Sequence, residues 1–169
     1  MNKIVNLVVC LIVGLTAPAV LAHKFSTAYM DVKEVAGQPT LLWKVALHDL
    51  AQARIIAADN SHQITWQQVL DSEPALNAYL AEHISFTSAG KPCQLSAAAA
   101  ASWQLQRLQK DFYLLLPVAV KCKNTSDWQL RYQALFASEP SHKLLLSWQI
   151  PGATANAVLS ANSATFPGN

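Results

Sequence analysis

Glycine is scarce in this chain, with 5 residues among 169, and there is no glycine-rich loop that could cradle a phosphate group. The Gly-x-Ser-x-Gly elbow that carries a serine nucleophile is also missing. The acidic residues are single and scattered among turns and helix starts, so no pair of carboxylates suggests a glycosidase. These absences predict a protein that is not an enzyme. The alternative is an enzyme whose site is assembled from distant residues and carries no local motif.

The chain also lacks an excess of charge of one sign. It has 12 Lys and Arg residues against 10 Asp and Glu residues, and no basic stripe is visible. A near-neutral balance of this kind argues against binding to nucleic acid or to an anionic membrane surface. We therefore expect no nucleic acid among the partners of this protein.

Long apolar runs are confined to the amino terminus. Lys3 precedes an apolar stretch at 4–15, and the small-residue sequence Ala19-Val20-Leu21-Ala22 follows it, which is the pattern of a cleaved secretory signal peptide. No later segment approaches the roughly 18 uncharged apolar residues that span a bilayer. The sequence thus predicts a signal peptide at 1–22 and a single domain at 23–169, exported to the periplasm and without membrane insertion after processing.

Cysteine is rare, and its placement is informative. Of the three cysteines, Cys10 lies in the predicted leader and is removed with it, so Cys93 and Cys122 remain. In an oxidising compartment they most simply form one disulfide, which closes a loop of about 30 residues. The alternatives are a metal-binding pair and a redox thiol, but both normally show Cys-x-x-Cys spacing, which is absent here.

Most of the mature chain alternates apolar and polar residues with the two-residue period of half-buried strands. Segments 25–32 and 41–47 form a predicted hairpin around a turn signal at 36–39. The clearest alternation runs over 128–136, and further strands are expected at 84–87, 92–95, 102–109, 112–121, 143–150 and 157–160. The predicted fold class is mainly β: an antiparallel β-sandwich, immunoglobulin-like or related.

Residues from about 49 to 83 depart from this alternation and show helical spacing. Thr65 and Gln68 have the three-residue separation of a capping box. Ser72-Glu73-Pro74 is typical of a second helix start. The sequence therefore predicts a helical insertion at about 49–83, between the second and third strands.

Several short motifs make the mature chain similar to a known bacterial domain. They are Ala22-His23-Lys24-Phe25-Ser26, Trp43-Lys44-Val45-Ala46-Leu47-His48-Asp49-Leu50, Ile64-Thr65-Trp66-Gln67-Gln68, Gly90-Lys91-Pro92-Cys93, Tyr132-Gln133-Ala134-Leu135-Phe136 and Pro140-Ser141-His142. In these motifs the chain resembles the extracytoplasmic N-terminal domain of HupE/UreJ-type membrane proteins, a family associated with nickel or cobalt uptake. The membrane-spanning helices of that family are absent from this sequence. The resemblance therefore implies a stand-alone outer module that works beside a separately encoded inner-membrane permease-like protein.

Histidine supplies the candidate metal ligands. His23 would be the first residue of the mature chain, where its amine and imidazole nitrogens can chelate one copper or nickel ion. A third ligand would come from another histidine or from an acidic residue: His48, His62, His83, His142, Asp31 or Asp49. Of these, His48 and His142 are the predicted ligands. No pair among them has a spacing that identifies a metal site by itself.

The alternative is that none of these histidines binds metal. His23 would then simply follow a permissive cleavage site, and His48 and His142 would lie in solvent at strand ends. His83 would occupy the carboxyl end of a helix, where a cation is favoured.

Together these features predict a non-enzymatic periplasmic accessory or interaction module, associated with a metal-related membrane transport system. One alternative function is direct binding of copper or nickel through His23. The other is an enzyme without a recognisable local motif. Only the metal-binding alternative requires a cofactor, which would be copper or nickel.

Overall fold

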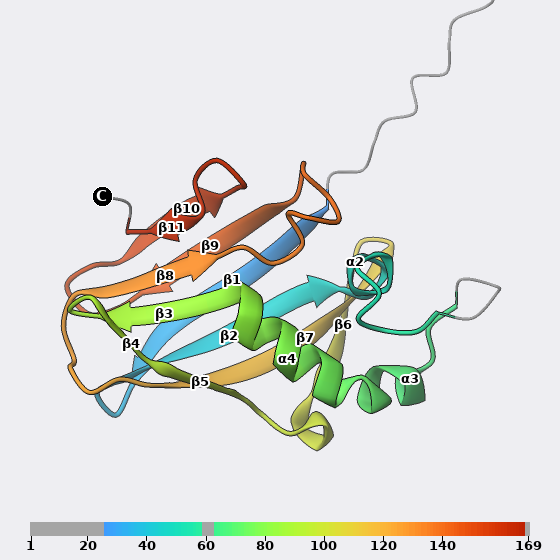
Figure 1. Cartoon of the computed structure of the whole chain (residues 1–169), viewed down its shortest axis with the longest axis horizontal. Helices are drawn as coiled ribbons and strands as arrows, with labels where there is room; N and C mark the ends of the chain where they lie inside the picture. Colours follow the sequence, from blue (N-terminus) through green and yellow to red (C-terminus); the bar gives the residue numbers. More distant parts are fainter. Residues whose placement is uncertain (1–25, 59–62, 168–169) are drawn as a thin grey trace, which may run out of the picture.

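The computed structural model of the protein describes residues 26–58 and 63–167, which form two facing β-sheets with helices at one side (Figure 1). The larger sheet has seven strands, six of them in the order β10 (Ala155–Leu159), β9 (Lys143–Gln149), β1 (Thr27–Val35), β2 (Gln38–Ala46), β7 (Asp111–Lys121) and β5 (Gln94–Ala97). The seventh, β6 (Gln104–Leu108), also pairs with β7. The smaller sheet has the order β11 (Thr165–Phe166), β8 (Trp128–Tyr132), β3 (Ile84–Ser88) and β4 (Lys91–Pro92). The predicted mainly-β sandwich is confirmed.

The first two strands form the hairpin that the sequence predicts, with antiparallel pairing from Tyr29 and Lys44 to Val35 and Gln38. Side chains alternate across a strand, so every second residue faces the small sheet. In β1 and β2, only Ala46 at the end of β2 is buried out of phase with this period. The buried residues that follow it include Ala28, Met30, Val32, Leu41, Trp43 and Val45. Rings from the two sheets meet in the core, where Phe86 stacks on Trp148 with ring centroids 5.8 Å apart.

Three helices lie between β2 and β3 in the chain: α2 (Leu47–Gln52), α3 (Trp66–Asp71) and α4 (Glu73–His83). A 3-10 turn, η1 (Ala100–Ser102), precedes β6. The helix α4 contacts both β3 and β5, and its buried residues Leu76 and Leu80 join the core between the sheets. Among the residues that the structure describes, no helix is both long enough and apolar enough to cross a bilayer.

Two details of the predicted strands are corrected. The strand expected over 128–136 ends at Tyr132, because the chain turns over 134–138 and leaves the sheet. Leu135 then takes a φ of 67° and stays buried, so the apolar pattern there reflects packing and not strand structure. In addition, β1 and β9 pair in parallel, whereas the sequence predicted antiparallel strands throughout.

The predicted disulfide is present between Cys93 and Cys122, whose Cα atoms are 4.5 Å apart. Cys93 lies between β4 and β5, where the chain passes from the small sheet to the large one. Cys122 directly follows β7, the strand with which β5 pairs. The bond therefore fastens the crossing between the two sheets to the long central strand.

The helix α3 begins with the capping box that the sequence predicts. The Gln68 N–H donates to Thr65 Oγ1 at 3.2 Å, and the Thr65 N–H donates to Gln68 Oε1 at 2.7 Å. Replacing Thr65 by alanine removes one of these acceptors, so we expect a loss of about 1 kcal/mol of unfolding free energy. Urea unfolding followed by circular dichroism checks this, and Thr65→Ser, which keeps the hydroxyl, is the control. A Thr65→Ala variant as stable as the wild type would contradict the expectation.

Candidate functional site

At one end of the strands of the large sheet, segments that are far apart in the sequence lie together (Figure 1). β1 and β2 are antiparallel, with Tyr29 opposite Lys44, so the start of β1 lies beside the chain that leaves β2 and enters α2. β2 and β7 are also antiparallel, with Ala46 opposite Tyr113, so the start of β7 lies at the same edge. We call this region the α2 edge.

A chain of buried hydrogen bonds runs inward from the α2 edge. The Ser26 hydroxyl donates to Asp49 Oδ2 at 2.8 Å, and Ser26 Oγ lies 2.5 Å from Nδ1 of His142. The other ring nitrogen of His142, Nε2, is 2.9 Å from the Tyr132 hydroxyl. All four side chains are buried. Because buried polar groups are costly when unpaired, this chain holds three distant segments in one arrangement.

Burial determines the protonation of this network. It lowers the pKa of His142 to about 4, against the opposing effect of the Asp49 and Glu139 carboxylates and with a further small lowering by Lys143. Burial also raises the pKa of the Tyr132 phenol well above its ordinary value. Both side chains are therefore neutral near pH 7 and take part as hydrogen-bonding groups, not as charges.

Serine, histidine and aspartate meet at the α2 edge, but not in the order of a nucleophilic triad. In a triad the histidine lies between the other two residues and takes the serine proton. Here Ser26 lies in the middle, with its hydroxyl directed to Asp49 and His142 on its other side. Ser26 is also buried. This arrangement suits a structural role better than acyl transfer.

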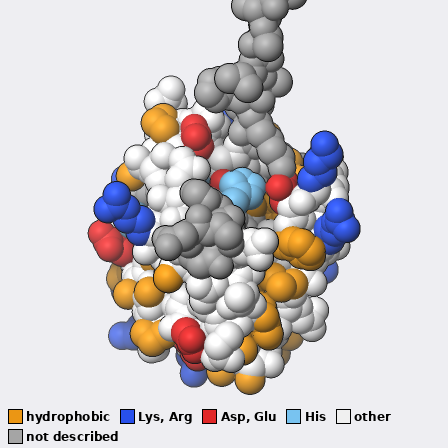
Figure 2. Space-filling view, turned by 90° about the vertical axis from the view of Figure 1, so that its right-hand side faces the viewer, with side chains coloured by type: hydrophobic (Ala, Val, Ile, Leu, Met, Phe, Trp, Pro, Cys, Tyr) orange, Lys and Arg blue, Asp and Glu red, His pale blue; other side chains and the backbone are white. Residues whose placement is uncertain are grey.

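His48 is the exposed member of the α2 edge, with 49% of its side chain accessible. Its Nε2 lies 3.0 Å from Asp49 Oδ1, and its Nδ1 lies 3.9 Å from Asp111 Oδ1. A hollow of about 210 Å³ opens beside it, lined by residues of α2 and of the start of β7 together with Ile64 and Lys110. Figure 2 shows a face of the molecule on which histidine atoms lie at the surface close to acidic side chains. An accessible imidazole next to carboxylates can bind a cation.

The three histidines predicted as metal ligands fall in different places. His48 lies at the α2 edge, and His23 lies outside the described residues. His142 is fully buried, and both of its ring nitrogens have partners in the core. The alternative that placed His142 in solvent at a strand end is therefore wrong. His83 packs against the ring of Tyr79, with ring centroids 4.2 Å apart, at the end of α4.

No complete metal centre is present within residues 26–58 and 63–167, because no three His, Cys, Asp or Glu side chains there are grouped closely enough to hold an ion. His62, another possible third ligand, lies outside the described residues. Asp31 pairs with Lys44 at 2.8 Å. Asp49, by contrast, is placed directly beside His48.

Three residues of this region were not predicted as site residues, although Ser26 and Tyr132 lie within the motifs that carry the resemblance. Ser26 is a single serine before a strand, Tyr132 occupies one apolar position in an alternating segment, and Asp111 follows a turn. They come together only through the pairing of strands that are distant in the sequence. Ser26 and His142, for example, are 116 positions apart.

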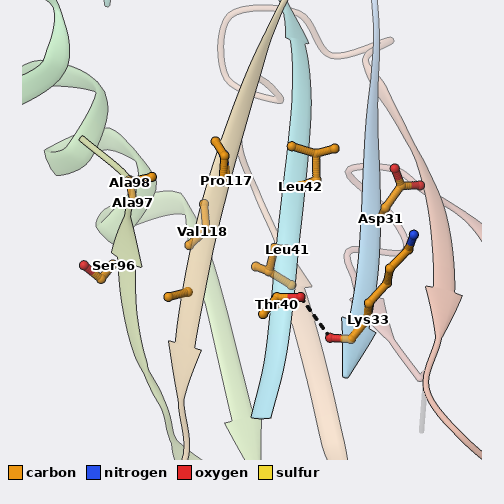
Figure 3. A pocket seen from close by; sticks show the side chains of 11 residues that line it. Asp31, Lys33, Thr40, Leu41, Leu42, Ser96, Ala97, Ala98, Pro117 and Val118 are labelled. Carbon is orange, nitrogen blue, oxygen red and sulfur yellow. Dashed lines mark hydrogen bonds between the residues drawn. The ribbon is translucent and has the colours of Figure 1, made fainter. Parts of the chain in front are cut away.

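The large sheet has a second feature on the face that points away from the small sheet. Two open hollows of about 500 and 440 Å³ lie there. Figure 3 shows the first hollow, with the side chains of Asp31, Leu42 and Pro117 on neighbouring strands. Leu145 and Val158, both exposed, lie at the second hollow. We call this surface the outer sheet face.

Neither a scan against protein-family models nor a search of the curated proteins found a match to this chain.

Proposed function

We propose that this protein is a non-enzymatic periplasmic accessory module that binds a copper or nickel ion at its mature amino terminus and serves a separately encoded inner-membrane permease-like protein. The observation that carries the proposal is the fixed position of Ser26, three residues after His23. The Ser26 hydroxyl bonds to Asp49, and its carbonyl accepts the Lys143 N–H at 3.1 Å. These bonds hold the start of the described chain at the α2 edge.

Chain geometry supports this placement. Three peptide units span at most about 11 Å. A mature chain that starts at His23 therefore has its amino group within reach of the α2 edge, where His48 is half exposed. Ser26, which follows the expected cleavage site, and the exposed His48 thus lie at the same end of the sheet.

The donor atoms suit a borderline metal. The amine and imidazole of His23 supply two nitrogens on one residue, and His48 supplies a third. Nitrogen donors of this kind are preferred by Cu²⁺ and Ni²⁺ over the hard ions Ca²⁺ and Mg²⁺. The Asp111 carboxylate, 3.9 Å from His48 Nδ1, places negative charge where a cation would sit. His142 is not part of this set, because its nitrogens are already bonded in the core.

The outer sheet face supports the accessory part of the proposal. It carries exposed apolar side chains, Leu145 and Val158, beside a hollow that also contains Lys44 and Asp31. A mixed apolar and charged surface of this type is common where a protein contacts a partner transiently.

The test is a metal titration of the correctly processed protein. Protein that begins at His23 is titrated with Cu²⁺ and Ni²⁺ by calorimetry, together with a variant that has one alanine before His23. The extension turns the chelating amine into an amide, so we expect affinity to fall about 100-fold or more through loss of the chelate. His48→Ala should also weaken binding, whereas His83→Ala, which removes an imidazole packed on Tyr79 of α4, should bind like the wild type.

Equal affinity in the extended and unextended proteins would remove His23 from the site. Equal affinity in His48→Ala and wild type would show that the α2 edge does not take part in metal binding. If the unextended protein binds neither ion more tightly than the extended protein does, the metal function fails.

A further inference from the structure

The buried hydrogen bonds below the α2 edge allow only one arrangement of protons. The Ser26 hydroxyl donates to Asp49 Oδ2 at 2.8 Å. With its single proton used, Ser26 Oγ can only accept from Nδ1 of His142. Neutral His142 then carries its proton on Nδ1, and its Nε2 accepts the Tyr132 hydroxyl proton. In this series of hydrogen bonds, every donor therefore points from the core toward Asp49.

The same reasoning applies to the other oxygen of Asp49. Its Oδ1 lies 3.0 Å from Nε2 of His48. A lone pair on that nitrogen would face a lone pair of the carboxylate oxygen at short distance, whereas an N–H there can donate to it. The proton of neutral His48 therefore belongs on Nε2. The lone pair is then on Nδ1, which lies on the side of Asp111, too far from its carboxylate at 3.9 Å for a hydrogen bond.

We propose that Tyr132, His142 and Ser26 are positioning residues for the metal site, and that Nδ1 of His48 is its metal-binding atom. The buried chain fixes the orientation of the Asp49 carboxylate, and Asp49 fixes the ring orientation and tautomer of His48. Carboxylates that orient a ligating histidine in this way tune metal sites in many proteins. The metal-binding part rests on the proposed function, whereas the tautomer of His48 does not.

Energetics favour such a role over stability alone. Four buried polar side chains occupy space that apolar residues of similar shape could fill at little or no cost in stability. Asp49 in particular has only 4% of its side chain accessible, yet it contacts a half-exposed histidine. Ser26 holds this carboxylate from below, and the carboxylate in turn contacts the surface side chain of His48.

The first measurement is made on metal-free wild-type protein. Nitrogen-15 NMR of the histidine rings at pH 8, where imidazoles are neutral, distinguishes protonated from unprotonated ring nitrogens. We expect His48 to carry its proton on Nε2 and His142 to carry its proton on Nδ1. A wild-type spectrum with the His48 proton on Nδ1 would overturn the proposal without any variant.

The second measurement compares variants. Ser26→Ala removes the link between His142 and Asp49, and Tyr132→Phe removes the innermost bond while keeping the rest. We expect Ser26→Ala to give a mixture of His48 tautomers and to weaken Cu²⁺ binding about 10-fold or more, with a smaller effect in Tyr132→Phe. Thr65→Ala, which affects stability elsewhere, should change neither. Circular dichroism and urea unfolding establish that each variant is folded.

The two proposals fail in different ways. If the wild type and His48→Ala bind Cu²⁺ equally, the proposed function fails, and the NMR spectra still decide the tautomer. If His48→Ala loses affinity while Ser26→Ala binds like the wild type and keeps one His48 tautomer, the positioning role is wrong. Should Ser26→Ala not fold, Tyr132→Phe with an unchanged His48 spectrum and unchanged affinity would equally show that the positioning role is wrong.

Discussion

Replacing both Cys93 and Cys122 by alanine should lower the free energy of unfolding by about 3 to 4 kcal/mol. The two residues are 29 positions apart, so the bond closes a loop of moderate length in the unfolded chain. Without it, the unfolded state gains conformational entropy and the crossing from β4 to β5 is held only by non-covalent contacts, among them strand pairing with β7 and the Cys93 N–H bond to the Phe86 carbonyl. Because small domains are stable by only about 5 to 15 kcal/mol, this is a large fraction of the total.

Urea unfolding of the oxidised wild type and of the double variant measures this difference. The matched control is the wild type unfolded with a reducing agent, which should approach the double variant, while the double variant itself should not respond to reductant. A difference below about 1 kcal/mol would mean that the bond contributes little to this fold.

Lowering the pH from 7 toward 4.5 should destabilise the protein through His142. In the unfolded chain this histidine has the ordinary pKa of about 6.5, whereas burial lowers the pKa to about 4 in the folded protein. Between these values the unfolded state binds a proton that the folded state does not. The stability that depends on neutral His142 is therefore complete above about pH 6.5 and is lost as the pH falls, up to about 3 kcal/mol near pH 4.

His142→Gln separates this effect from the titration of carboxylates. Glutamine does not titrate, so the variant should be less stable than the wild type at pH 7.5 but should lose less stability between pH 6.5 and 4.5. Urea midpoints at intervals of half a pH unit give both slopes. Parallel slopes for the two proteins would show that His142 does not control acid stability.

The sequence predicts those parts of the fold that depend on neighbouring residues. The two-residue alternation around Trp43 places this side chain in the core, and it is fully buried. The Thr65 and Gln68 pair begins a helix, and the turn signal at 36–39 separates the two strands of the first hairpin. Each of these features needs information from only a few adjacent positions, which is why a local pattern is sufficient.

Features that depend on distant segments are not visible in the sequence. The strand that starts at Trp128 ends early, and beyond it the Leu135 N–H bonds to the Tyr79 hydroxyl at 2.7 Å, 56 positions away. The parallel pairing of β1 with β9 likewise follows from the path of the chain between them. His142 had the same appearance as any exposed histidine near a turn, and only its contacts with Ser26 and Tyr132 reveal a buried role.

The α2 edge contains a residue that the sequence identifies and contacts that the sequence does not reveal. His48 could be singled out by residue type, but its orientation depends on Asp49, Ser26 and the residues behind them. From residue type alone, His48 and His142 are therefore predicted as equivalent metal ligands. Their difference is one of burial, since one is half exposed and the other is enclosed.

Electron paramagnetic resonance of the Cu²⁺-loaded protein that begins at His23 tests the central claim most directly. Nitrogen hyperfine structure reports how many nitrogens bind the ion. We expect three nitrogen donors in the wild type, namely the amine and imidazole of His23 and Nδ1 of His48, and two in His48→Ala. Identical spectra from the wild type, His48→Ala and the protein extended by one alanine would contradict a metal site built from the mature amino terminus and the α2 edge.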